Sequence, residues 1–130
     1  MLSSRVAFVL RTQALLFFLT SVGLIVQPLK IAAALGFASS SLSTQLSWTL
    51  RTLGVMLLVP ALLAPLVAAF AGERGLRQAS SGMGFIMTAL SAWMPFSPGR
   101  WSSSKSAVEA IFLVLACAYF FALRGRRRNR

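Results

Sequence analysis

The stretch Trp48–Phe70, WTLRTLGVMLLVPALLAPLVAAF, decides the fold class of this chain. It holds 23 residues and a single charged side chain, Arg51, near its start. A helix needs about 20 apolar residues to cross the hydrocarbon core of a bilayer, so the stretch predicts a membrane-spanning helix. Pro60 and Pro65 lie inside it, but prolines bend rather than end a membrane helix when neighbouring helices satisfy the freed carbonyl groups.

The rest of the chain shares this apolar character. Of its 130 residues, 57% are hydrophobic and only 12% are charged, which is unlike the composition of a soluble globular domain. We therefore expect an all-α integral membrane protein that forms a single domain, a bundle of four transmembrane helices. The predicted spans and the basic tail that follows them are residues 6–27, 48–70, 80–96, 106–123 and 124–130.

Two connecting segments complete the predicted organisation. Residues 71–78, AGERGLRQ, predict a loop because glycine and charged residues gather there. Ile31–Phe37 is apolar but too short to span a membrane. It either continues the first helix beyond a kink at Pro28 or lies in the membrane interface.

The distribution of lysine and arginine predicts the orientation, because cytoplasmic loops carry an excess of both. With the N-terminus inside, nine of the thirteen basic residues lie on the inner side: Arg5, Arg11, Arg74, Arg77, Arg124, Arg126, Arg127, Arg128 and Arg130. The outer side then holds Lys30, Arg51, Arg100 and Lys105. In this orientation Trp48, Trp93 and Trp101 all lie at the outer interface, where indole side chains are enriched. Both features predict N-in/C-in topology.

The sequence fits two membranes, a bacterial inner membrane and a mitochondrial-type organellar inner membrane. Met1–Arg11 carries serine and arginine and lacks acids, as mitochondrial targeting segments do, although a positive-inside flank explains the same residues. A secretory signal peptide with a small-residue cleavage site at Ala32–Ala34 is a further interpretation of this end.

The residue counts exclude most catalytic chemistry. The chain has no histidine, no aspartate and one cysteine, Cys117, whereas zinc, di-iron, bis-histidine haem and Ser-His-Asp sites require such side chains. We expect no enzyme activity and no metal or cofactor held by this chain's own side chains. Cys117, between two alanines of the last span, is interpreted as a buried, inert thiol.

Of the two acidic residues, Glu109 is the better candidate for a structural or functional role. It follows Ser106 by three positions, and Ser-x-x-Glu at a helix start is a capping box. Arg51 has the same predicted depth, so an ion pair between Glu109 and Arg51 would join the second and fourth spans. The alternative is a proton- or substrate-binding carboxylate, because ionisable residues within membrane segments are often functional.

Small residues at helical spacing predict helix packing, since they let helix backbones approach closely in lipid. The second and third spans carry such stripes at Gly54, Ala61, Ala68, Gly84, Thr88 and Ala92. The first span is richer in large side chains, among them Phe17 and Phe18. It is therefore expected at the periphery of the bundle or against a partner.

The basic tail predicts contact with anionic lipid head groups in addition to its role in orientation. The tail arginines are Arg124, Arg126, Arg127, Arg128 and Arg130. No aromatic residues are interleaved with them, so the tail does not indicate a nucleic-acid partner.

Three functions fit this sequence. The favoured one is a non-catalytic accessory or structural subunit of a larger membrane complex of respiratory or photosynthetic type, bound to other membrane-protein subunits. It is favoured because the chain lacks catalytic groups and an ionisable residue at the predicted midplane. The alternatives are a small oligomeric transporter or channel, which would use the kinked second span with Arg51 or Glu109, and a membrane protein that binds lipid or an apolar ligand.

Overall fold

The computed structural model describes residues 2–97 and 100–124, and all regular secondary structure within them is helical. The elements are α1 (Leu2–Val26), α2 (Pro28–Ala34), the 3-10 helix η1 (Ser39–Ser41), α3 (Thr44–Phe70), α4 (Glu73–Trp93), the 3-10 helix η2 (Met94–Phe96) and α5 (Ser103–Leu123). The all-α fold class is confirmed. Among the described helices α1, α3 and α5 are long and apolar enough to cross a membrane.

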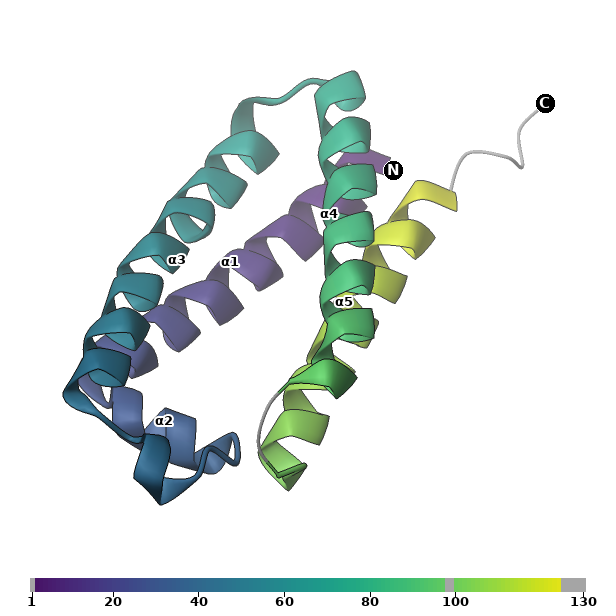
Figure 1. The fold of residues 1–130 in the computed structure, drawn as a ribbon. Coiled ribbons are helices and arrows are strands. Elements are labelled where there is room, and N and C mark those ends of the chain that lie inside the picture. The colour runs from purple at the N-terminus through teal and green to yellow at the C-terminus, as the bar shows by residue number, and fades with distance from the viewer. Residues whose placement is uncertain (1, 98–99, 125–130) are drawn as a thin grey trace.

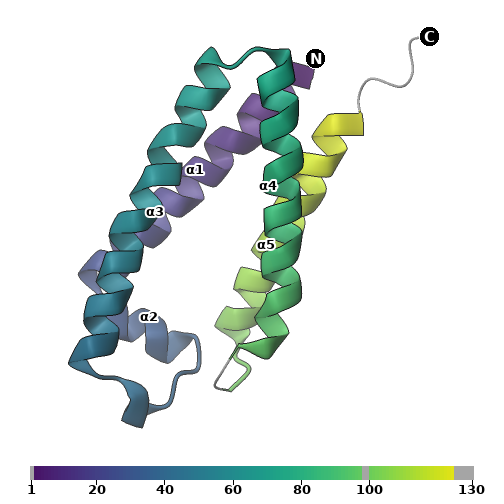
Figure 2. The same cartoon turned by 45° about the horizontal axis from the view of Figure 1, so that its top comes forward.

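The four long helices run alternately up and down the molecule (Figure 1). The start of α1, the link between α3 and α4, and the end of α5 lie together at what we call the N-terminal end. The opposite end, which we call the α2 end, holds α2, η1, and the turn from α4 to α5. Figure 2 shows the same arrangement from another angle, with α2 lying across this end of the molecule.

The helices pack as two pairs, α1 with α3 and α4 with α5, and α1 also contacts α4 and α5. The core lies where α1, α4 and α5 meet and contains Val6, Leu10, Leu76, Met87, Leu115, Ala116, Tyr119 and Ala122. Helices α3 and α4 are consecutive in sequence but scarcely contact each other. The core therefore leaves most of α3 exposed.

The expectation of a peripheral first span is wrong, because α1 contacts all four of the other α-helices. Its buried face combines the apolar residues Val6, Leu10 and Leu24 with the small or polar residues Gln13, Ala14 and Ser21. Phe17 is half-buried against the core, and Phe18, one residue further along the helix, is exposed.

Helix α3 continues through both of its prolines, as expected. Its N-cap is Ser43, whose Oγ accepts a hydrogen bond of 3.2 Å from the backbone N–H of Leu46. The helix then runs without a break past Pro60 and Pro65 to Phe70. The residues before the predicted start at Trp48 are helical because the serine cap satisfies a backbone donor of the first turn.

The segment after the first span is a separate short helix. Gln27, with φ −135°, breaks α1, and Pro28 occupies the first position of α2, where a missing backbone N–H costs no hydrogen bond. Gly36 ends α2 with φ +87°, and the N–H groups of Gly36 and Phe37 donate to the carbonyls of Ala33 and Ala32. This is a Schellman motif, in which glycine supplies the left-handed residue.

The third predicted span differs most from the structure. The predicted loop at 71–78 is wrong, since α4 begins at Glu73 and only Ala71 and Gly72 separate it from α3. Burial of Leu76 against the core stabilises this first part of the helix despite its glycine and charges. Because α4 takes in these polar residues, it is not among the described helices that are apolar enough to span a membrane.

Candidate functional site

Among residues 2–97 and 100–124, no group of three or more His, Cys, Asp or Glu side chains comes together. Polar contacts between helices are instead found at the α2 end around Ser102, in the core around Tyr119, and between Ser21 of α1 and Gly54 of α3. The first two places join helices that are far apart in sequence.

Arg51 and Glu109 are not brought together. Arg51 is exposed on α3 and Glu109 is half-buried on α5, each near the α2 end. Helices α3 and α5 scarcely contact each other, and within the described residues no ion pair joins the two side chains. The predicted pair is not formed because α3 packs on α1 rather than on α5.

The capping box predicted at Ser106 and Glu109 is wrong by one turn. Helix α5 begins at Ser103, and its N-cap is Ser102, whose Oγ accepts a hydrogen bond of 3.3 Å from the backbone N–H of Lys105. Ser106 lies inside the helix, where its Oγ accepts a hydrogen bond of 2.7 Å from Nε1 of Trp101. The helix starts earlier because Ser102 supplies the same kind of cap upstream.

Ser102 also ties α5 to α2. Its Oγ donates a hydrogen bond of 3.0 Å to the carbonyl of Ala34, and the N–H of Arg100 donates one of 3.2 Å to the carbonyl of Gly36. A Cβ atom on Gly36 would lie 2.3 Å from the carbonyl oxygen of Arg100, so the two backbones are in close contact. We call this junction of Ala34, Gly36, Arg100 and Ser102 the α2 clasp.

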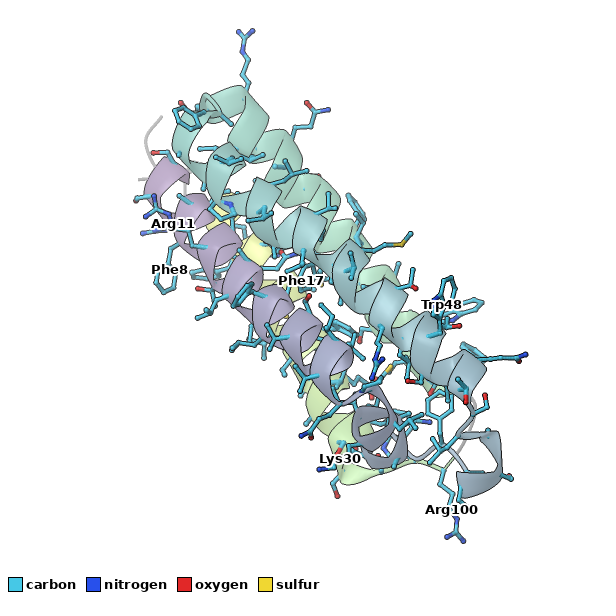
Figure 3. The ribbon with its side chains drawn as sticks, turned by 90° about the vertical axis from the view of Figure 1, so that its left-hand side faces the viewer. Phe8, Arg11, Phe17, Lys30, Trp48 and Arg100 are labelled. Atoms are coloured by element: carbon cyan, nitrogen blue, oxygen red, sulfur yellow. The ribbon has the colours of Figure 1, made fainter. Side chains whose placement is uncertain are left out.

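The three tryptophans lie at the α2 end, each on or beside a different long helix. Trp48, Trp93 and Trp101 are all exposed, by 70%, 72% and 51%. Figure 3 shows Trp48 at the same end as Lys30 and Arg100, away from Phe8 and Arg11 near the start of α1. The α2 end thus gathers the indoles that the predicted topology assigns to one interface.

The small residues of α3 lie toward α1. Gly54 and Ala61 are buried, and Ala68 is half-buried against the core. At Gly54 the two backbones approach closely, since Oγ of Ser21 donates a hydrogen bond of 2.6 Å to its carbonyl. A Cβ atom on Gly54 would lie 3.0 Å from Cβ of Leu24.

The small residues of α4 divide between two faces. Gly84 is buried, and a Cβ atom there would lie 3.1 Å from Cζ of Phe120 on α5. Thr88 and Ala92 are exposed, and Oγ1 of Thr88 donates a hydrogen bond to the carbonyl of Gly84 within the helix. The stripe that α4 buries is Leu76, Ser80, Gly84, Met87 and Ser91.

A second stripe of small residues lies on the opposite face of α4. Gly75, Gly82 and Ala89 are spaced by seven, close to two helical turns, and all three are exposed. A Cβ atom on Gly82 would meet no atom within 4 Å. We call this surface the α4 outer face; it comprises Gly75, Gln78, Gly82, Ile86, Ala89 and Trp93, all exposed.

Sequence reasoning missed the α4 outer face. The seven-residue spacing is readable in the sequence, but residues 71–78 were expected to form a loop, which removed Gly75 from the pattern. The spacing of four from Gly84 to Thr88 and Ala92 was also more conspicuous.

A buried polar contact in the core was also missed. The hydroxyl of Tyr119 donates a hydrogen bond to Oε1 of Gln13, and both side chains are almost fully buried. Oγ of Ser80 donates one of 3.2 Å to the carbonyl of Tyr119, so α1, α4 and α5 meet at this residue. The available signals were a glutamine within an apolar run and the chain's single tyrosine.

Two further predictions concern the burial of Cys117 on α5 and the arginines of the basic tail. Cys117 is exposed, so the prediction of a buried thiol is wrong. Ala116 faces the core, and the next residue lies about 100° further round the helix. Arg124 is exposed at the end of α5. The other tail arginines, Arg126, Arg127, Arg128 and Arg130, lie outside the described residues.

Comparisons with protein-family models, with curated proteins and with solved structures found no match to this chain.

Proposed function

We propose that this chain is a non-catalytic accessory subunit of a larger membrane complex, and that its α4 outer face binds a helix of another subunit. The observation that carries the proposal is the row Gly75, Gly82 and Ala89, which lies exposed on the long helix whose composition is least suited to lipid.

Contact with lipid acyl chains stabilises such a surface only weakly. Glycine and alanine let a second helix backbone come close, and packing of this kind drives helix association where the hydrophobic effect does not act. The face also exposes Gln78, whose side-chain amide finds hydrogen-bond partners more readily on a protein than among acyl chains. The buried stripe of α4 already faces the rest of this chain, so the outer face is available to a partner.

The proposal includes four membrane spans. Helices α4 and α5 are each 21 residues long, which is roughly 30 Å and close to the thickness of the hydrocarbon core. The two pack side by side along their length (Figures 1 and 2). Contact with α5 on one face and with a partner on the other would compensate for the polar residues of α4.

We further propose that the N-terminal end faces the cytoplasm or matrix. It carries five described basic residues, namely Arg5, Arg11, Arg74, Arg77 and Arg124, whereas the α2 end carries four, Lys30, Arg51, Arg100 and Lys105, together with the three tryptophans. A bacterial inner membrane and a mitochondrial-type inner membrane both fit this arrangement.

The orientation predicts a labelling pattern for single-cysteine variants made with Cys117→Ser. Ser40 in η1 and Gly72 between α3 and α4 are both exposed and lie at opposite ends. With a membrane-impermeant maleimide on spheroplasts or mitoplasts, Ser40→Cys should be labelled at once and Gly72→Cys only after permeabilisation. The reverse pattern would show that the orientation is opposite to the proposed one. Labelling of both variants from outside would show that α3 does not cross the membrane.

Photo-crosslinking in native membranes tests the accessory role. A benzophenone maleimide on Gly82→Cys, in the Cys117→Ser background, places the probe on the α4 outer face. The native Cys117 is the matched control, because it is exposed on a different helix. We expect a discrete product with a second polypeptide from position 82 and none from position 117.

Two other outcomes would contradict the accessory role. A product composed of two copies of this chain would favour the oligomeric transporter or channel instead. Equal crosslinking from positions 82 and 117, or only lipid adducts from both, would show that the α4 outer face is not an interface.

A further inference from the structure

A groove of about 340 Å³ lies between α1 and α5 at the N-terminal end. Phe8 and Val9 of α1 form one wall, and Ala118 and Phe121 of α5 form the other. Phe8 is 72% exposed and Phe121 is 69% exposed, so two phenylalanine rings border an open, apolar depression. Its volume falls within the range of about 300 to 1,000 Å³ that is usual for ligand pockets.

Basic side chains border this groove. Arg5 is one of its lining residues, and Arg124 follows Phe121 by three residues at the end of α5. Arg11 lies on the same side of α1 as Phe8 (Figure 3). All three guanidinium-bearing residues are exposed, and within the described residues none of them forms an ion pair.

We propose that the groove binds one anionic phospholipid, with an acyl chain between Phe8 and Phe121 and the phosphate at Arg5 and Arg124. A side chain on a helix leans toward the helix N-terminus, so Arg11, which follows Arg5 by nearly two helical turns, can extend back toward the same head group. The inference is independent of the α4 outer face, because the groove lies between α1 and α5.

Charge complementarity favours an anionic phospholipid as the occupant of the groove. The N-terminal end carries five described arginines and one described acid, Glu73. A phospholipid supplies both an apolar chain for the groove and a phosphate for the arginines, and guanidinium groups bind phosphate through paired hydrogen bonds. A partner helix would match the apolar walls but would need several carboxylates to match the charge.

Native mass spectrometry of the purified chain in mild detergent tests the site. The probes are phosphatidylglycerol and phosphatidylcholine with identical acyl chains, added at equal concentration. We expect the chain to retain phosphatidylglycerol preferentially. Arg5→Gln should lower that retention roughly fivefold, the factor expected for one basic residue at an anionic surface, and leave phosphatidylcholine unchanged.

Two matched controls separate the groove from a general charge effect. Arg100→Gln removes an exposed arginine at the α2 end and should leave retention unchanged. Ala118→Leu partly fills the groove and should weaken both lipids, whereas Ala110→Leu at an exposed position elsewhere on α5 should weaken neither. Equal retention of the two lipids by the unmodified chain would overturn the proposal. So would equal loss in Arg5→Gln and Arg100→Gln, or an Ala118→Leu variant that keeps its lipid.

Discussion

Replacing Gly36 by alanine is expected to destabilise the protein by about 2 to 3 kcal/mol. An alanine at φ +87° is held in the left-handed region, which costs roughly 1 to 2 kcal/mol. Its Cβ would also lie 2.3 Å from the carbonyl oxygen of Arg100, so the α2 clasp must open and its hydrogen bonds are lost. The melting temperature in detergent, followed by tryptophan fluorescence, should fall by roughly 10 °C.

Gly72→Ala is the matched control for this experiment. Gly72 has φ −68°, which alanine adopts without strain, and a Cβ atom there would meet nothing within 4 Å. We expect its melting temperature to stay within about 2 °C of the unmodified protein. If the two alanine variants lose the same stability, the close approach of Gly36 to Arg100 does not stabilise the fold.

Replacing Gly54 by leucine should be at least as damaging, with a loss of about 3 kcal/mol. Atoms of Ser21, Leu24 and Ile25 already lie 3.0 to 3.1 Å from the position of a Cβ. A leucine must therefore push α1 away from α3, and the 2.6 Å hydrogen bond from Ser21 to the Gly54 carbonyl would be lost. We expect a lowered melting temperature and a broadened size-exclusion peak.

Gly82→Leu makes the same chemical change within another long helix, at a position where a Cβ meets no neighbour. Both variants gain the same helix propensity, so any difference between them reports the α1–α3 contact. Purified alone in detergent, Gly82→Leu should melt close to the unmodified protein. A comparable loss in both would mean that Gly54 does not mark a tight helix crossing.

The spans were predictable where an apolar run alone determines the helix. Trp48–Phe70 lies within α3, and residues 106–123 lie within α5, with each helix beginning a few residues earlier at a serine cap. The run at 80–96 was predicted with the wrong limits. There the helix depends on tertiary contact, because Leu76 is buried in a core cluster that includes residues of α1 and α5, and no local pattern reveals that cluster.

Pairing between helices could not be read from the sequence. Arg51 and Glu109 have the same predicted depth, but depth does not specify which helices are neighbours. Gln13 and Tyr119 lie 106 positions apart, and only the packing of α1 against α5 brings them together. The sequence also does not reveal which face of α5 is buried. Ala116 is buried, whereas its neighbour Cys117 is exposed.

The α2 clasp also has a consequence for the order of biosynthesis. Ser102 and Ala34 lie 68 positions apart, and chains emerge from the ribosome with the N-terminal part first. The carbonyls of Ala34 and Gly36 therefore lack these hydrogen-bond donors while α3 and α4 are being made. They acquire those partners only when Arg100 and Ser102 arrive, so closure of the clasp is a late step that a nascent chain ending before residue 100 cannot take.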